Sequence, residues 1–219
     1  KYHASDNHEE YSKLLDWGLR LTLLLAAPAA LALALLAIPL ITTLFYHGAF
    51  NSNDVFQTRS ALAAYSVGLT GMILVKVLAP GFYARQNIRT PVKIALVSLL
   101  ATQVMNLAFI GWLEHAGLAL SIGLAACLNA GLLYRGLRQH GVYQPQAGWA
   151  TFSFKLLIAM LVMAAALWFG IGSESTWFAF SLLERVMRLT LLVVLGAAIY
   201  FVTLWILGFR IRDFKRRAA

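Results

Sequence analysis

Long apolar stretches alternate with short polar joints along most of this chain. Each stretch holds about 17 to 25 residues, and a helix needs about 20 apolar residues to cross the hydrocarbon core of a bilayer. The pattern therefore predicts six transmembrane helices, at residues Leu21–Phe45, Ala61–Leu78, Val92–Leu113, Leu118–Tyr134, Trp149–Ile171 and Val186–Phe209.

Residues 1–20 differ from the rest because they begin with polar side chains and then place Tyr11, Leu14 and Leu15 on one helical stripe. This pattern predicts a short helix on the membrane surface that leads into the first span. A tight joint is expected at residues 114–117, between the third and fourth spans.

Prolines mark the expected irregularities of the spans. Pro28 and Pro39 lie inside the first apolar run, where each removes a backbone hydrogen bond and favours a kink. Pro80 and the glycine after it are expected to end the second span. Thr90 is a candidate cap for the third, with Pro91 at the first helical position.

Composition supports the membrane assignment. The 219 residues are 60% hydrophobic and 12% charged, with a mean hydropathy of +0.72. A soluble domain carries roughly 25% charged residues, so the class is an all-α polytopic membrane protein. The net charge of +9 does not indicate nucleic-acid binding, because the basic residues lie at the ends of apolar runs rather than along one face.

The basic residues also predict an orientation. Segments 1–20, 83–93, 135–155 and 209–219 hold 14 of the 18 lysines and arginines, and the alternate joints hold 3. Short cytoplasmic loops carry an excess of Lys and Arg, so both ends of this chain are expected in the cytoplasm. The chain begins Lys-Tyr-His without an initiator methionine, and we expect it to be part of a longer polypeptide.

Lys76 is the one charge well inside an apolar run, and Arg59 lies near the other end of the same span. A cation within the membrane is a candidate contact for an anionic substrate. The alternative for Lys76 is that its long stem reaches the polar interface. Arg59 faces either an anionic ligand or lipid head groups, and lipid head groups are favoured.

Thr102, Asn106 and Ser121 place oxygen atoms in the third and fourth spans. Together they could hold a monovalent cation or line a polar path, although hydrogen bonds between helices would explain the same residues. The spans contain no carboxylate pair, histidine cluster, nucleophile elbow or phosphate loop. The sequence therefore predicts neither an enzyme nor a metal site, and no other cofactor.

Four segments carry a resemblance to a known family. They are VKVLAPGFYARQNIRTPVK at 75–93, YSKLLDWGLR at 11–20, QVMNLAFI at 103–110 and AGLALSIGLAACLN at 116–129. The first resembles a cytoplasmic loop of the MurJ (MviN) family of lipid II flippases, in which a Phe-Tyr-Ala and Arg-Thr-Pro phrase is typical. The similarity covers essentially the whole chain.

The resemblance implies a fourteen-helix, two-lobe transporter of the multidrug/oligosaccharidyl-lipid/polysaccharide (MOP, MATE-like) exporter fold. Such proteins move lipid II, the undecaprenyl-linked peptidoglycan precursor, across the bacterial inner membrane by alternating access. By this resemblance the chain is the C-terminal part, and the missing N-terminal lobe is its partner, together with lipid II and membrane lipids. It divides into a lead-in at 1–20, four helices of the second lobe at 21–138 and two additional helices at 139–219.

The resemblance also implies that the last two helices form a groove for the polyprenyl tail. Candidate groove residues are Leu157, Met160 and Trp168, although a helix that simply faces lipid would carry the same side chains. Two other functions stay open at this point. One is another exporter of the same superfamily, for a drug or a polysaccharide, and the other is a membrane-embedded enzyme that modifies lipids.

Overall fold

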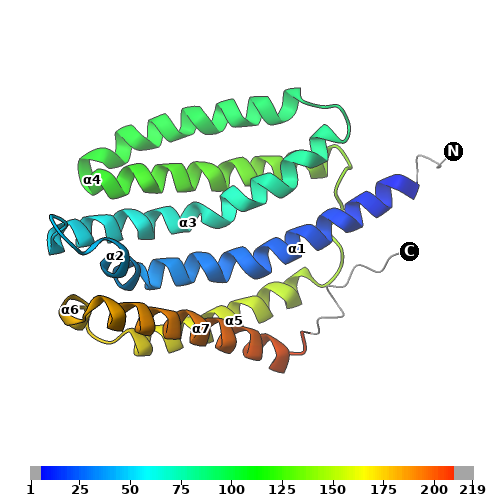
Figure 1. Cartoon of the computed structure of the whole chain (residues 1–219). Coiled ribbons are helices and arrows are strands. Elements are labelled where there is room, and N and C mark those ends of the chain that lie inside the picture. The colour runs from blue at the N-terminus through cyan, green and yellow to red at the C-terminus, as the bar shows by residue number, and fades with distance from the viewer. Residues whose placement is uncertain (1–5, 210–219) are drawn as a thin grey trace.

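The computed structural model describes residues 6–209, and all of its regular structure is helical. Residues 210–219, which belong to the basic segment at 209–219, lie outside the described residues. Figure 1 shows the helices lying roughly along one direction, with α2 and α6 at one end of the bundle. The helices are α1 Asp6–Leu35, α2 Ala37–Phe45, α3 Ser52–Tyr83, α4 Arg89–Gln139, α5 Trp149–Ile171, α6 Glu174–Ala179 and α7 Leu182–Ile206.

Five of the described helices, α1, α3, α4, α5 and α7, are long and apolar enough to cross a membrane. Helix α4 has 51 residues and would be about 77 Å long if it were straight. Instead its backbone turns at Glu114, where φ is 47° and ψ is −125°, and Figure 1 shows its two halves side by side. The predicted joint at 114–117 is thus confirmed.

The short helix expected within residues 1–20 and the first span form one continuous helix, and a position of its first turns on the membrane surface stays a prediction. Helix α1 continues from Asp6 to Leu35 because Leu15 and Leu19 pack in the same core as α3 and the second half of α4. The predicted Trp149–Ile171 helix, by contrast, has the bounds of α5.

Pro28 does not end α1, and the break between α1 and α2 falls at Leu36. Pro28 has no N–H for the carbonyl of Leu24, and the hydroxyl of Tyr200 on α7 donates to that carbonyl at 2.6 Å instead. Pro39 lies in the first turn of α2, where no intrahelical donor is required.

Pro80 also lies inside a helix, so the prediction that it ends the second span is wrong. The turn after it is held by packing, since Phe82 is buried and a side chain on Gly81 would lie 2.8 Å from Leu137. Thr90 is not the cap of α4. Ile88 lies at the N-cap position, and the side chain of Asn87 before it accepts from the Thr90 N–H at 3.2 Å.

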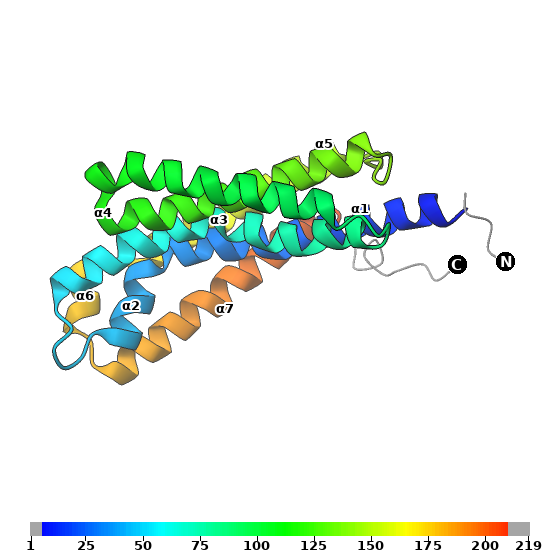
Figure 2. The same cartoon turned by 90° about the horizontal axis from the view of Figure 1, so that it is seen from above.

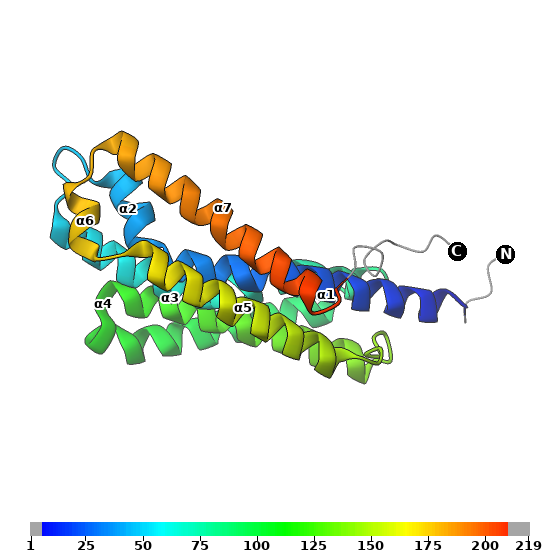
Figure 3. The same ribbon diagram turned by 90° about the horizontal axis from the view of Figure 1, so that it is seen from below.

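The helices form two packed groups around α1. Helices α3 and α4 lie on one side of α1, and α5 and α7 lie on the other (Figure 1). Seen from above and from below, α7 runs obliquely to α1 (Figures 2 and 3). One buried core joins α1 to α3 and α4, and a second joins α1 and α2 to α5 and α7.

Helix α3 and the second half of α4 approach each other closely at two glycines. A Cβ on Gly68 would overlap the Cα of Gly123, and a Cβ on Gly71 would lie 2.8 Å from the backbone nitrogen of Cys127. Small residues permit such backbone contact between helices in a membrane. These glycines therefore fix the distance between α3 and α4.

We expect Gly68→Ala to lower the free energy of unfolding of the complete protein in detergent by about 1–3 kcal/mol, because the new methyl group overpacks the contact. Gly111→Ala is the matched control, since no atom lies within 4 Å of its Cβ position. Chemical denaturation, monitored by circular dichroism, measures the free energy of unfolding of each variant. Equal stability of the two variants would contradict the proposed contact.

Candidate functional site

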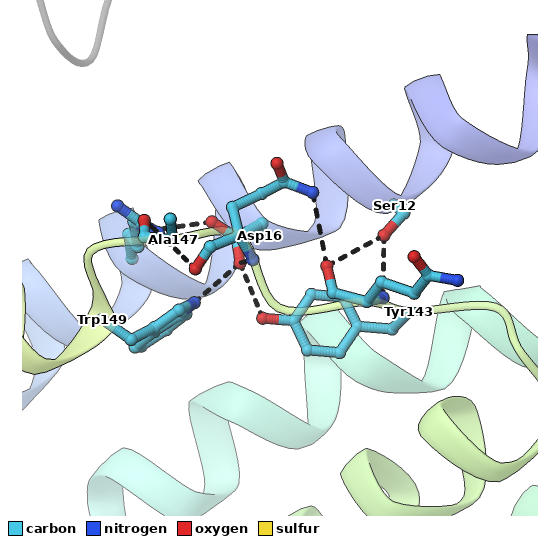
Figure 4. Close-up of polar contacts among 8 residues, drawn as sticks. Ser12, Asp16, Tyr143, Ala147 and Trp149 are labelled. Atoms are coloured by element: carbon cyan, nitrogen blue, oxygen red, sulfur yellow. Dashed lines mark hydrogen bonds and ion pairs between the residues drawn. The ribbon is translucent and has the colours of Figure 1, made fainter.

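A buried carboxylate joins α1 to the connector between α4 and α5. Asp16 is 3% exposed, and its Oδ1 accepts three hydrogen bonds, from the Tyr143 hydroxyl at 2.7 Å, the Trp149 indole at 2.7 Å and the Gln146 N–H at 3.1 Å. Figure 4 shows the side chains of Tyr143 and Trp149 pointing toward Asp16. The cluster ties together segments that are more than 120 residues apart.

Arg20 completes this cluster. Its Nε lies 2.8 Å from Oδ2 of Asp16, and its Nη2 donates to the carbonyls of Gln146 and Ala147 at 3.3 and 2.9 Å. Its guanidinium also lies 5.2 Å from the ring centre of Trp149. The charge of Asp16 is therefore paired, as a buried carboxylate requires.

Two more contacts reinforce the cluster. The Ser12 hydroxyl donates to the carbonyl of Gln144 and accepts from its N–H. Burial, followed by the hydrogen bond to Asp16, raises the pKa of Tyr143 above that of an exposed tyrosine. The phenol consequently stays protonated and keeps donating to Asp16.

A buried cation occupies the opposite end of the bundle. Arg185 of α7 is 7% exposed and donates to three carbonyls, those of Thr42, Tyr46 and Phe178, at 3.2, 3.2 and 3.0 Å. Its guanidinium lies 5.0 Å from the ring centre of Tyr46. These carbonyls lie in the last turns of α2 and α6, where helices leave acceptors unsatisfied and favour positive charge. Arg185 thus joins α2, α6 and α7.

The structure places the two predicted anion contacts apart from these clusters. Lys76 is exposed on α3, and none of the three ion pairs within residues 6–209 includes it. Arg59 is half-exposed and lies 3.3 Å from Glu174, an acidic residue of α6. Glu174 therefore supplies a partner for Arg59 that was not considered from the sequence.

Thr102 and Ser121 donate their hydroxyls to carbonyls one turn earlier in α4, those of Ser98 and Gly117. Asn106 differs, because its Oδ1 is buried without a hydrogen-bond partner. Gly117 in the second half of α4 closely approaches the Phe109 carbonyl in the first half. Asn106 lies three residues before Phe109 and Ser121 four residues after Gly117, so both lie at a similar distance from the turn at Glu114. A cation held by these oxygens stays a prediction.

The predicted tail residues do not share one environment. Leu157 and Trp168 are exposed on α5, whereas Met160 packs against the core between α1, α5 and α7. A cavity of about 290 Å³ lies between those three helices, and α5 lines it with Met163 and Leu167 instead. A tail site at Leu157, Met160 and Trp168 stays a prediction.

The polar groups of the two clusters join helices to one another. Within the described part of the chain, no three His, Cys, Asp or Glu side chains are grouped so that they could bind a metal. Sequence reasoning missed Asp16 and Arg185. Asp16 lies in a segment taken for a surface helix, and Arg185 in one counted as a loop.

Five long apolar helices, packed by close glycine contacts and joined by polar clusters at both ends, define a multi-pass α-helical membrane protein. Residues 1–188 match the sequence profile of the family described as lipid II flippase MurJ. The chain belongs to the MurJ family.

Individual relatives agree with this assignment. The chain is 50% identical to a lipid II flippase MurJ of Burkholderia cenocepacia, over all of its own residues and 42% of the relative. It is 38% identical to a probable lipid II flippase MurJ of Vibrio cholerae, over 97% of this chain and 41% of that protein. The chain thus spans about two-fifths of the length of these relatives.

A solved structure is also similar. It is described as lipid II flippase MurJ in an inward closed conformation, and the two align with a TM-score of 0.76. The alignment covers 97% of this chain and 41% of that chain, at 21% identity. At this identity the likeness concerns the fold.

We expect Asp16→Ala to lower the free energy of unfolding of the complete protein by about 3 kcal/mol, because Arg20 then loses its carboxylate and two buried donors lose their acceptor. Glu9→Ala is the control. This change removes a solvent-exposed ion pair, in which Lys13 Nζ lies 2.7 Å from Glu9 Oε1. No measurable change in the free energy of unfolding is expected. A loss of stability no larger than that of the control would contradict the role given to Asp16.

Proposed function

We propose that the complete protein is a lipid II flippase that works by alternating access, and that this chain supplies its C-terminal part. The observation that carries the proposal is the 50% identity to a lipid II flippase over every residue of this chain. The similarity extends over all the helices and connectors of this chain. Lipid II would move from the inner to the outer leaflet of the bacterial inner membrane.

The proposed topology has six crossings. The two halves of α4 count separately because the backbone reverses at Glu114 (Figure 1). An even number of crossings returns the chain to the side where it started, and the 14 basic residues on that side favour the cytoplasm for both ends. The connector at 140–148 then lies at the cytoplasmic face. These six helices would be the last of the fourteen.

Lys76 is our candidate for a contact with the pyrophosphate of lipid II. It is exposed on α3, about 10 Å along the helix from the end at Tyr83. An ammonium group at this depth is costly unless an anion or water meets it. Arg59 is a weaker candidate, because Glu174 already lies within ion-pair distance.

The cavity between α1, α5 and α7 is our candidate for the polyprenyl tail. Its lining is almost wholly apolar and includes Pro28, Met163, Leu167 and Ala197. Met163 adds a flexible side chain that adapts to an irregular ligand. The candidate residue Met160 packs next to this region, whereas Leu157 and Trp168 lie on the exposed side of α5.

The part of the relatives that this chain does not cover is expected to contain the first lobe. The first half of α4 exposes apolar side chains along most of its length, among them Leu100, Val104 and Leu107. This face is suited to contact with lipid or with that lobe. A monovalent cation at Asn106 would couple transport to an ion gradient, which the unpaired Oδ1 supports.

We expect Lys76→Gln in the complete protein to slow lipid II flipping by about 10- to 100-fold, since a hydrogen bond to a charged group contributes roughly 1.5–3 kcal/mol. Lys93→Gln, an exposed change in the basic joint, is the control. Flipping is measured in proteoliposomes with a head-group protection assay. Normal transport by Lys76→Gln would remove Lys76 from the mechanism.

We expect Ala197→Trp to slow flipping about tenfold. The indole would fill the cavity, and the tail would bind more weakly by roughly 1.4 kcal/mol. Ala198→Trp, exposed on the same helix but outside the cavity lining, is the control. A substrate analogue with a short tail should be much less affected. Equal slowing for short and long tails would show that the cavity does not hold the tail.

A further inference from the structure

A second apolar cavity lies among α1, α3 and the second half of α4, and α5 borders it only with its first residue, Trp149. It has a volume of about 410 Å³, and its walls come from α1, α3, the second half of α4 and the start of α5. Helix α5 packs mainly on α7 and α1. We call this cavity the α4–α5 crevice.

The crevice runs inward from the end of the bundle that holds the 140–148 connector. On α4 its lining extends from Tyr134 to Cys127, about 10 Å along the helix, and on α3 from Leu78 to Thr70, about 12 Å. This is about a third of the thickness of the hydrocarbon core. Trp149 lines the crevice at its connector end, where an amphipathic ring suits the membrane interface.

The mouth of the crevice is basic. Cys127, Gly131, Tyr134 and Arg138 follow one stripe of α4, so Arg138 continues the lining by one turn, about 6 Å, towards the connector. Its guanidinium is exposed and lies 5.9 Å from the ring centre of Tyr134. None of the ion pairs among residues 6–209 involves Arg138.

The sequence around the crevice strengthens this charge. Between His115 and Ser173 there is no aspartate or glutamate, while Arg135, Arg138 and Lys155 are present. An apolar cavity with a basic mouth complements an amphiphile that has one acyl chain to bury and an anionic head. Basic pockets between transmembrane helices on the cytoplasmic side bind lipid head groups in this way.

We propose that the α4–α5 crevice binds an anionic phospholipid, with one acyl chain along α3 and the second half of α4 and its phosphate at Arg138. The bound lipid fills the cavity that this chain leaves open and contacts α5 at Trp149. This binding does not depend on transport of lipid II, so it stands or falls separately from the proposed function.

Two variants test the site from its two ends. Gly131→Leu fills the crevice, and no atom lies within 4 Å of its Cβ position, so the change fits the fold. Gly111→Leu has the same freedom outside the crevice and is its control. Arg138→Gln removes the cation at the mouth, and Arg89→Gln removes an exposed arginine at the start of α4 as its control.

Native mass spectrometry of the complete protein, titrated with phosphatidylglycerol or with phosphatidylcholine of the same acyl chains, measures binding. We expect the unchanged protein to hold one phosphatidylglycerol in preference to phosphatidylcholine. Gly131→Leu should abolish this binding, and Arg138→Gln should weaken it about fivefold, the equivalent of ~1 kcal/mol, without affecting phosphatidylcholine. Both controls should bind as the unchanged protein does.

Three results would overturn the proposal. Unchanged binding by Gly131→Leu would mean that the lipid lies elsewhere. Equal weakening by Arg138→Gln and Arg89→Gln would mean that only the overall charge attracts it. Displacement of phosphatidylglycerol by undecaprenyl pyrophosphate, with loss of flipping in Gly131→Leu, would assign the crevice to the transported lipid instead.

Discussion

The arrangement of this chain depends on satisfying backbone groups where water is absent. Each unpaired carbonyl in hydrocarbon costs several kcal/mol, so every interruption of a helix needs a donor from elsewhere. Tyr200 donates to the carbonyl that Pro28 leaves without a partner, and Arg185 donates to carbonyls at the ends of α2 and α6. Both donors come from α7. Helix α7 is therefore positioned by the irregularities of the first two helices as well as by apolar packing.

Polar contacts at both ends of the bundle explain how an apolar cavity persists between them. Asp16 ties α1 to the start of α5 at one end, while Arg185 ties α7 to α2 at the other. The middle of this interface contains the 290 Å³ cavity between α1, α5 and α7. The fixed ends hold the helices apart without requiring that side chains fill the space. A lipid tail could therefore enter without separating the helices from α1.

The sequence predicted the all-helical class because the signal of long apolar helices is local. The helix at Trp149–Ile171 and the turn at Glu114 follow from apolar length and from a short polar joint. The continuous α1 was missed, since its polar first turns resemble a surface helix until α3 and α4 cover Leu15 and Leu19. Of the Asp16 cluster, only the ion pair with Arg20, four residues along the same helix, follows from spacing in the sequence. The donors to Oδ1 of Asp16 lie 127 to 133 residues away, and periodicity carries no information about such pairs.

Burial shows which of the cations an anion can reach. By sequence, Lys76 and Arg185 are both positive charges close to apolar runs, and either could meet an anionic substrate. In the structure, three carbonyls and an aromatic ring already surround Arg185, so an anion would have to displace these contacts before binding. Lys76 and Arg138 are exposed, and none of the ion pairs among residues 6–209 includes either of them. An anion therefore reaches these two residues at a lower cost than it reaches Arg185, and they lie on different helices, α3 and α4. In the proposed function and the proposed lipid site, the pyrophosphate of the transported lipid and the phosphate of the resident lipid would therefore be held by separate cations and would not compete for one site.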